Sequence, residues 1–231
     1  IAWPLEGRYK AQDCFFFYAG ALIFAQMYAL TGERKYLTRG AIPFADKIIA
    51  DHIRADGAFG TSAPTEDSHH VNRKGGLAGV FVNDDGIGVA LLAVYAVTGD
   101  SRYLDAAVGS ADFWTRATEA PAALAVYPCV ALLLADVYRL TGDRKYLPRI
   151  TEYVRKTLSL QYRSPREPFL HGAYIGEDMA KAYDPKSCPT DYVDLRITSY
   201  ALMALAKVAA EKPAQWGCAY SCFGWPTSAR K

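Results

Sequence analysis

A phrase built from a tyrosine, a Thr-Gly pair, an acid and a Tyr-Leu pair occurs three times in the sequence. It reads YALTGERKYL from Tyr28, YAVTGDSRYL from Tyr95 and YRLTGDRKYL from Tyr138. A strongly apolar segment precedes each copy, and a more amphipathic segment follows it. A helix that is apolar on all sides is typically buried on both sides, whereas an amphipathic helix keeps one face in solvent. The repeat therefore predicts three hairpins, each made of a buried inner helix and a half-exposed outer helix.

The Thr-Gly pair is the predicted turn of each hairpin. Its glycines can adopt the left-handed conformation that often ends a helix; they are Gly32, Gly99 and Gly142. The acids that follow can cap the start of the next helix or favour it by their charge; they are Glu33, Asp100 and Asp143. We therefore interpret the acids and tyrosines of the phrase as structural.

The hairpins are not evenly spaced along the chain. The first interval, from Tyr28 to Tyr95, is longer than the second and holds an irregular segment over about 54–84. A second irregular segment covers about 162–193, and a fourth inner helix is predicted after it in DLRITSYALMALAKVAAEK. Pro213 would end that helix. The pattern thus predicts about seven main helices.

Composition excludes several classes of protein. Hydrophobic residues make up 51% of the chain and charged residues 22%, which is ordinary for a folded globular protein. A net charge of +2 gives no electrostatic basis for nucleic-acid binding. No uncharged apolar run is long enough for a membrane span. The sequence has no phosphate-binding or dinucleotide fingerprint, so we predict no cofactor.

The three turns and the segment DDGIGVALLAVYAVTGDSRYLDAAVGSADFW resemble the (α/α) toroid proteins, particularly the six-hairpin glycosidase-like domains. The resemblance covers about two-thirds of the chain. It implies an all-α hairpin array of toroid type. Because a complete toroid of this kind has twelve helices, we expect residues 1–231 to form one incomplete barrel, as a fragment or domain of a larger protein. The open edge would be covered by another subunit or by a further chain segment.

Inner helices of such an array all run in the same direction, so all Thr-Gly turns lie at one end, which we call the turn rim. The opposite end, the loop rim, receives both irregular segments and the starts of the inner helices. Long irregular connections are more often functional than the helices they join. We therefore expect any functional site to lie on the loop rim.

Asp84 and Asp85, in NDDG at the start of an inner helix, are the main catalytic candidates. Glycoside hydrolysis uses two carboxyl groups in different environments, one protonated and one ionised. The resemblance to unsaturated glucuronyl hydrolases implies an Asp pair at inner-helix starts that adds water to a vinyl ether, and Asp84 or Asp85 matches that position. The alternative is that one of them is only a helix cap. Glu177 and Asp178 are further catalytic candidates, because nearby aromatic side chains can desolvate a carboxyl group in a loop.

Other polar and aromatic residues of the loop rim are candidates for substrate binding. Acids recur at inner-helix starts, and aromatic rings can stack on sugars, although packing in the core explains either pattern equally well. The candidates are Asp13, His70, Asn83, His171, Tyr174, Asp194, Arg196 and Trp225.

A metal site is not predicted. His69 and His70 are adjacent and lack the spacing that places two ligands on one helical face. Cys218 and Cys222 do not fit the zinc ligands of lanthionine-cyclase-like toroids.

Three functions remain open from the sequence. The favoured hypothesis is a carbohydrate-processing domain that acts as a glycoside hydrolase through carboxylates on the loop rim, with a carbohydrate or another polar small molecule as its substrate. The second is a polysaccharide lyase or sugar epimerase that uses a tyrosine or histidine as its base. The third is a non-catalytic helical-repeat module that binds or supports a partner.

Overall fold

The protein is an all-helical array over the part of the chain that the structure describes. This computed structural model describes residues 14–60, 75–81, 86–121, 124, 126–163, 171–174 and 195–209. Within these ranges every regular secondary-structure element is a helix, and β pairing is limited to three isolated bridges.

The helices follow the predicted order. The long ones are α1 (Cys14–Thr31), α3 (Ile42–Asp51), α4 (Ile87–Thr98), α5 (Ser101–Arg116), α6 (Val126–Thr141), α7 (Leu147–Ser159) and α8 (Leu195–Ala209). Short elements precede some of them: α2 (Arg34–Tyr36), a π-helical turn η2 (Leu37–Ala41), and the 3-10 turns η3 (Gly75–Leu77) and η4 (Arg144–Tyr146). The described residues therefore contain seven main helices, which confirms the prediction.

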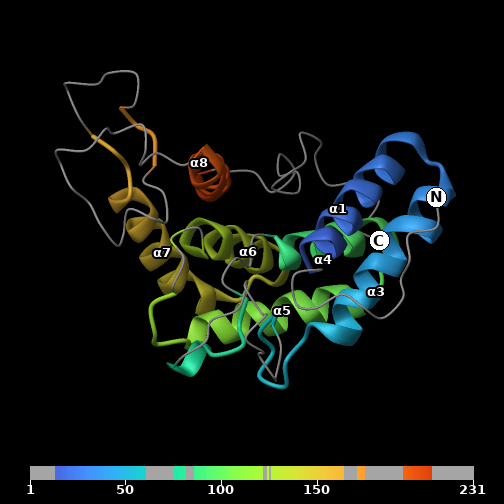
Figure 1. Ribbon diagram of the computed structural model, residues 1–231, viewed down its shortest axis with the longest axis horizontal. Helices are drawn as coiled ribbons and strands as arrows, with labels where there is room; N and C mark the ends of the chain where they lie inside the picture. Colours follow the sequence, from blue (N-terminus) through green and yellow to red (C-terminus); the bar gives the residue numbers. More distant parts are fainter. Residues whose placement is uncertain are drawn as a thin grey trace.

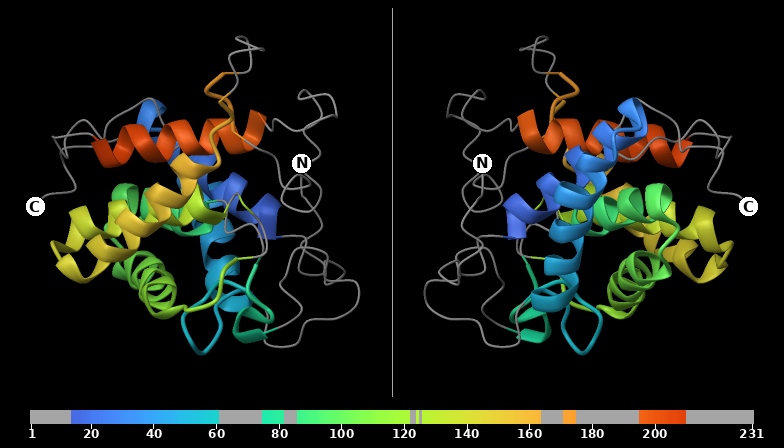
Figure 2. Two further views of the ribbon diagram at one scale, coloured as in Figure 1. Left: turned by 90° about the vertical axis from the view of Figure 1, so that its left-hand side faces the viewer. Right: turned by 90° about the vertical axis from the view of Figure 1, so that its right-hand side faces the viewer.

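The helices form two layers arranged as an incomplete barrel of toroid type. Figure 1 shows α3, α5 and α7 around the outside, with α4 and α6 inside them. In the same view α8 lies above α6 and α5 below it, and the side views of Figure 2 keep this order. Helix α4 contacts α1 and α5, and α6 contacts α7 and α8. Nearly every residue of α4 is buried, because it has neighbours on all sides.

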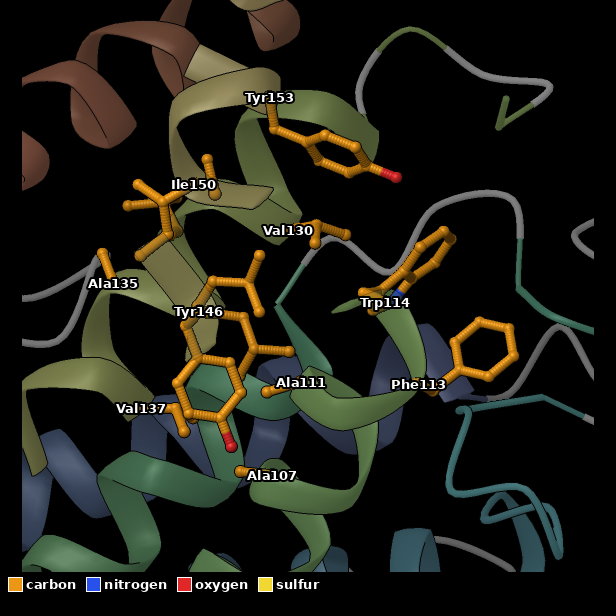
Figure 3. Packing of buried hydrophobic residues seen from close by; sticks show 14 of the residues in the cluster. Ala107, Ala111, Phe113, Trp114, Val130, Ala135, Val137, Tyr146, Ile150 and Tyr153 are labelled. Atoms are coloured by element: carbon orange, nitrogen blue, oxygen red, sulfur yellow. The ribbon is translucent and has the colours of Figure 1, made fainter. Parts of the chain in front are cut away.

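The largest part of the core lies between α5, α6 and α7. Trp114 and Phe113 of α5 meet edge to face, with ring centroids 5.3 Å apart. Figure 3 shows Tyr146 beside Val137 of α6 and Ala107 and Ala111 of α5, with Ile150 of α7 in the same cluster. The amphipathic outer helices thus bury one face against the inner layer.

The three Thr-Gly turns have one geometry. Gly32, Gly99 and Gly142 have φ angles of 70°, 72° and 72°, in the left-handed region that favours glycine. The preceding threonine, at 31, 98 or 141, donates its hydroxyl to the carbonyl four residues earlier and accepts the amide of the following acid. The repeated threonine therefore closes the end of each inner helix.

The acids of the turns behave as predicted in two cases of three. Asp100 accepts the backbone N–H of Arg102, and Asp143 accepts that of Lys145. Glu33 makes no side-chain capping bond to α2 and instead forms an ion pair with Lys35. A longer side chain at this position replaces the cap with a surface contact.

The second tyrosine of the phrase links consecutive hairpins. The Tyr103 hydroxyl donates to Asp46 of α3 over 2.8 Å, and the Tyr146 hydroxyl donates to Asp112 of α5 over 2.7 Å. In each case the acceptor belongs to the outer helix of the preceding hairpin. Burial and the Asp112 carboxylate raise the pKa of Tyr146 to about 12. The same hydrogen-bonded contact thus links consecutive hairpins along the turn rim, and we call this contact the tyrosine joint.

Helices α6 and α8 run in the same direction. Leu124, just before α6, packs in one cluster with Ile197 at the start of α8. Asp136, near the end of α6, forms a buried ion pair with Lys207 near the end of α8. Parallel inner helices place their starts on the same rim, as the toroid arrangement requires.

Helix α1 differs from the other inner helices in its exposure. It carries no charged residue over Cys14–Thr31. Nevertheless Ile23 and Leu30 are 55% and 52% exposed. The prediction of burial on both sides is therefore correct for α4 and wrong for the outer face of α1, where the described residues provide no second neighbour.

Candidate functional site

Two parts of the α3–α4 connection on the loop rim form one hydrogen-bonded platform. Residues 52–60 follow α3, and residues 75–81 precede α4. Isolated bridges join Ile53 to Phe59 and Gly60 to Val80, and the Phe81 amide donates to the Phe59 carbonyl over 3.1 Å. This pairing fixes the chain immediately before residues 82–85.

Charged side chains hold the platform together and attach it to α5, because Arg116 of α5 donates to the Asp56 carbonyl over 3.3 Å. Arg54 binds Asp56 through two hydrogen bonds and also donates to the Ala78 carbonyl. Partial burial acts to raise the pKa of Asp56, but the hydrogen bonds from Arg54 and from the Ala58 amide lower it overall. Asp56 is therefore an ionised structural anchor rather than a proton donor.

A second attachment comes from the α5–α6 connection. Glu119 accepts the Gly76 amide over 2.6 Å. A Cβ atom on Gly75, whose φ is +70°, would lie 2.2 Å from a Glu119 carboxylate oxygen, so this contact requires glycine there. The platform, which is part of the α3–α4 connection, is consequently held to the α5–α6 connection as well.

His52 is the titratable group most enclosed in this platform. It ends α3, its side chain is about 9% exposed, and its ring lies 5.6 Å from that of Phe81. Burial lowers the pKa of its imidazole, with opposing effects from Asp51 and Lys47. A neutral imidazole thus lies on the loop rim at neutral pH. The sequence analysis overlooked it, although its position at the end of a predicted outer helix was a usable signal.

Tyr127 is a second group that the sequence analysis did not consider. It lies in the first turn of α6 and meets Tyr153 of α7 edge to face, with centroids 5.2 Å apart. Burial raises the pKa of Tyr127, and the nearby Glu152 raises it further. The phenol is therefore protonated at neutral pH and suited to donate a proton rather than to accept one.

The leading acid pair lies outside the described residues. Asn83, Asp84 and Asp85 fall between Phe81 and Gly86, both of which are described. Gly86 precedes α4 with a φ of 148°, and its carbonyl accepts the Ala90 amide over 2.7 Å. The described chain on both sides belongs to the loop rim, while the roles of these three residues stay predictions.

Most of the other candidates also lie outside the described residues. They are Asp13, His70, Glu177, Asp178, Asp194 and Trp225. Arg196 lies in the first turn of α8, and its side chain is not among those described. The structure therefore brings none of these side chains together, and their assignments stay predictions.

His171 and Tyr174 belong to a described segment of the loop rim. The His171 side chain is exposed. Tyr174 is 1% exposed and packs with Ile197 and Ala201 of α8. Phe59 and Phe81, two further aromatics of the rim, are likewise buried in the core. Of these four residues, only His171 lies exposed to solvent.

The described part of the chain supports neither a metal site nor a membrane-spanning helix. Among those residues, no group of three or more histidines, cysteines, aspartates or glutamates is arranged to hold a metal ion. None of the helices described there has the length and apolarity needed to cross a membrane.

Comparison with known proteins gives a fold but no family. No known protein family matches the sequence, and no curated protein matches it. A solved structure of a polysaccharide lyase is similar, with a TM-score of 0.57 and 18% sequence identity over 92% of this chain. The chain spans 57% of the length of that lyase. At this identity the similarity shows a shared fold.

Proposed function

We propose that this chain is a carbohydrate-processing domain whose site lies on the loop rim. The observation that carries the proposal is the unequal use of polar residues at the two rims. On the turn rim, the threonines, acids and second tyrosines make structural contacts that repeat from hairpin to hairpin. The loop rim instead has irregular connections on a rigid platform, which suits a substrate site.

The first candidate reaction is hydrolysis of a glycosidic bond. Asp84 and Asp85 would supply the carboxylates, with Glu177 or Asp178 as the protonated acid. The acid would protonate the leaving oxygen while water adds to the sugar, so that one water molecule is consumed for each bond broken. The remaining candidates on the rim, apart from the buried Tyr174, would hold the sugar hydroxyl and carboxylate groups.

The second candidate reaction is elimination, and two observations favour it. The similar solved structure is that of a polysaccharide lyase. In addition, the loop rim contains a neutral imidazole, His52, and a protonated phenol, Tyr127. In elimination a base removes the C5 proton of a uronate, the C4–O bond breaks, and the electron pair forms a C4=C5 double bond. The departing oxygen takes a proton, and no water is consumed.

Product analysis separates the candidates. The full chain is incubated with uronate-containing oligosaccharides in water labelled with heavy oxygen, and reducing ends, ultraviolet absorbance and label are measured. Hydrolysis predicts new reducing ends that carry the label, without new absorbance. Elimination predicts new reducing ends with absorbance from the double bond and without the label. Binding without any new reducing end would contradict an enzymatic role and favour a non-catalytic module.

A further inference from the structure

A buried ion pair joins the last two inner helices at the end far from the loop rim. Asp136 of α6 and Lys207 of α8 are 3% and 7% exposed, and their side chains meet at 2.5 Å. Burying two charges costs about as much as their attraction returns, so apolar side chains of similar size would stabilise this contact equally well. What a buried pair adds is a fixed register between the two helices.

The other end of α8 holds a segment of the loop rim. The Tyr174 amide donates to the Thr198 hydroxyl of α8 over 3.0 Å. The same segment pairs with residues 161 and 162, because the Tyr162 amide donates to the Ala173 carbonyl and the Gly172 amide donates to the Tyr162 carbonyl. Residues 171–174 are therefore held between the end of α7 and the first turn of α8.

We propose that the Asp136–Lys207 pair sets the register of α8 on α6, and that α8 in turn positions residues 171–174 on the loop rim. Apolar side chains of α8 such as Ala201 and Ala204 also pack into the core, and apolar packing has little directional preference. A slip of one residue along α8 would rotate it by about 100° and remove Thr198 from Tyr174. Asp136 and Lys207 are thus positioning residues.

The functional meaning of this coupling rests on the proposed function, because His171 of this segment is a proposed substrate contact. The coupling itself is a physical property of the free protein. It can therefore be measured without substrate, and a failure of the glycan assay would leave it intact.

The test is amide hydrogen exchange, measured by NMR on the full chain. The double variant Asp136→Leu/Lys207→Met removes both charges of the pair, so neither partner is left as a buried unpaired ion, and we expect helix content and Tm to stay close to those of the natural sequence. We expect exchange of the Tyr174 amide to become about tenfold faster or more, with amides of α4 unchanged. A Tyr174 amide that exchanges at the unaltered rate would overturn the proposal.

Two single variants sharpen the result. Thr198→Val keeps the side-chain shape but removes the acceptor, and should speed exchange at Tyr174 while the amides of α8 stay protected. Asp136→Glu keeps both charges of the pair but lengthens the acidic side chain by one methylene. The variant protein therefore folds without an unpaired charge, and exchange of the Tyr174 amide should again become faster. If Thr198→Val has no effect, the hydrogen bond does not position the segment. If Asp136→Glu has none, the pair does not set the register.

Discussion

The two rims of this array are built from different kinds of sequence. On the turn rim one phrase occurs three times, its threonine and glycine take the same role in each copy, and its second tyrosine takes one role in the second and third copies. On the loop rim no phrase repeats, and the described connections are joined by contacts that occur once, such as Arg54 with Ala78 and Glu119 with Gly76. Repetition indicates a role in assembling hairpins, and its absence leaves the loop rim free for function.

The largest effect we expect separates the rims by activity. Asp84→Asn or Asp85→Asn should reduce glycan cleavage by about 100-fold or more, because an amide cannot act as an acid or base. The matched control is Asp143→Asn on the turn rim, which should leave cleavage unchanged. Initial rates of product formation and Tm are measured for all three variants. Full activity in both loop-rim variants would contradict their assignment.

The turn glycines test the opposite property, stability. A Cβ on Gly142 would meet nothing within 4 Å, so only the left-handed backbone resists a side chain. Gly142→Ala should lower the free energy of unfolding by about 1–2 kcal/mol, measured by urea denaturation. Gly109→Ala within α5 is the control, because its Cβ would make only an ordinary contact at 3.7 Å. An equal loss in both variants would show that backbone conformation is not the cause.

The tyrosine joints should each contribute slightly less to the free energy of unfolding than a turn glycine does. Tyr146→Phe removes the donor to Asp112 and should cost about 1 kcal/mol of unfolding free energy, while Lys145 still pairs with that carboxylate. Tyr103→Phe should behave similarly through Asp46. Tyr138→Phe is the control within the same phrase, because the described contacts of Asp112 come from Tyr146 and Lys145 and not from the Tyr138 hydroxyl. A loss as large in the control would argue against the joint.

The same joint predicts sensitivity to alkali. The folded state raises the pKa of Tyr146 from 10.0 to about 12, so this group stabilises the fold fully below pH 10. That contribution is lost as the pH rises from about 10 to about 12. Urea unfolding of the natural sequence should therefore weaken over this range more than unfolding of Tyr146→Phe. Parallel pH profiles would contradict a buried, hydrogen-bonded phenol.

For His52 on the loop rim we expect a smaller loss of folding stability, which occurs at low rather than at high pH. Its depressed pKa means that the folded state disfavours the protonated imidazole, so stability is complete above the ordinary value near 6.5 and falls as the pH drops through the lowered value. NMR titration of the labelled His52 ring should give a pKa below the ordinary histidine value. A His52 ring that titrates at its ordinary value would show that it is solvated.

The repeat made the hairpins predictable because periodicity and turn chemistry are local. The phrase alone placed Gly99 and Asp100 at a helix junction, as the structure has them. The hydroxyl contacts of Tyr103 and Tyr146 were not predictable, since their acceptors lie 57 and 34 residues earlier. Asp136 was likewise overlooked within an apolar segment, because its partner Lys207 is 71 residues away.

The position of the loop rim was predictable from the sequence, but the contacts made there were not. Two long insertions between repeats indicated where a site would lie. Which side chains meet there depends on pairings such as Phe81 with Phe59 that follow no period. Tyr174 illustrates the difference: its sequence context suggested an aromatic face for a sugar, and the structure buries its ring against α8.

The most direct test of the central claim maps where a glycan binds. Amide exchange of the full chain is compared with and without a uronate-containing oligosaccharide, over the loop-rim segments 52–60, 75–81 and 171–174 and over the turns around Gly32, Gly99 and Gly142. We expect protection to increase on the loop-rim segments and to stay constant at the three turns. Protection confined to the turns would contradict the assignment of function to the loop rim.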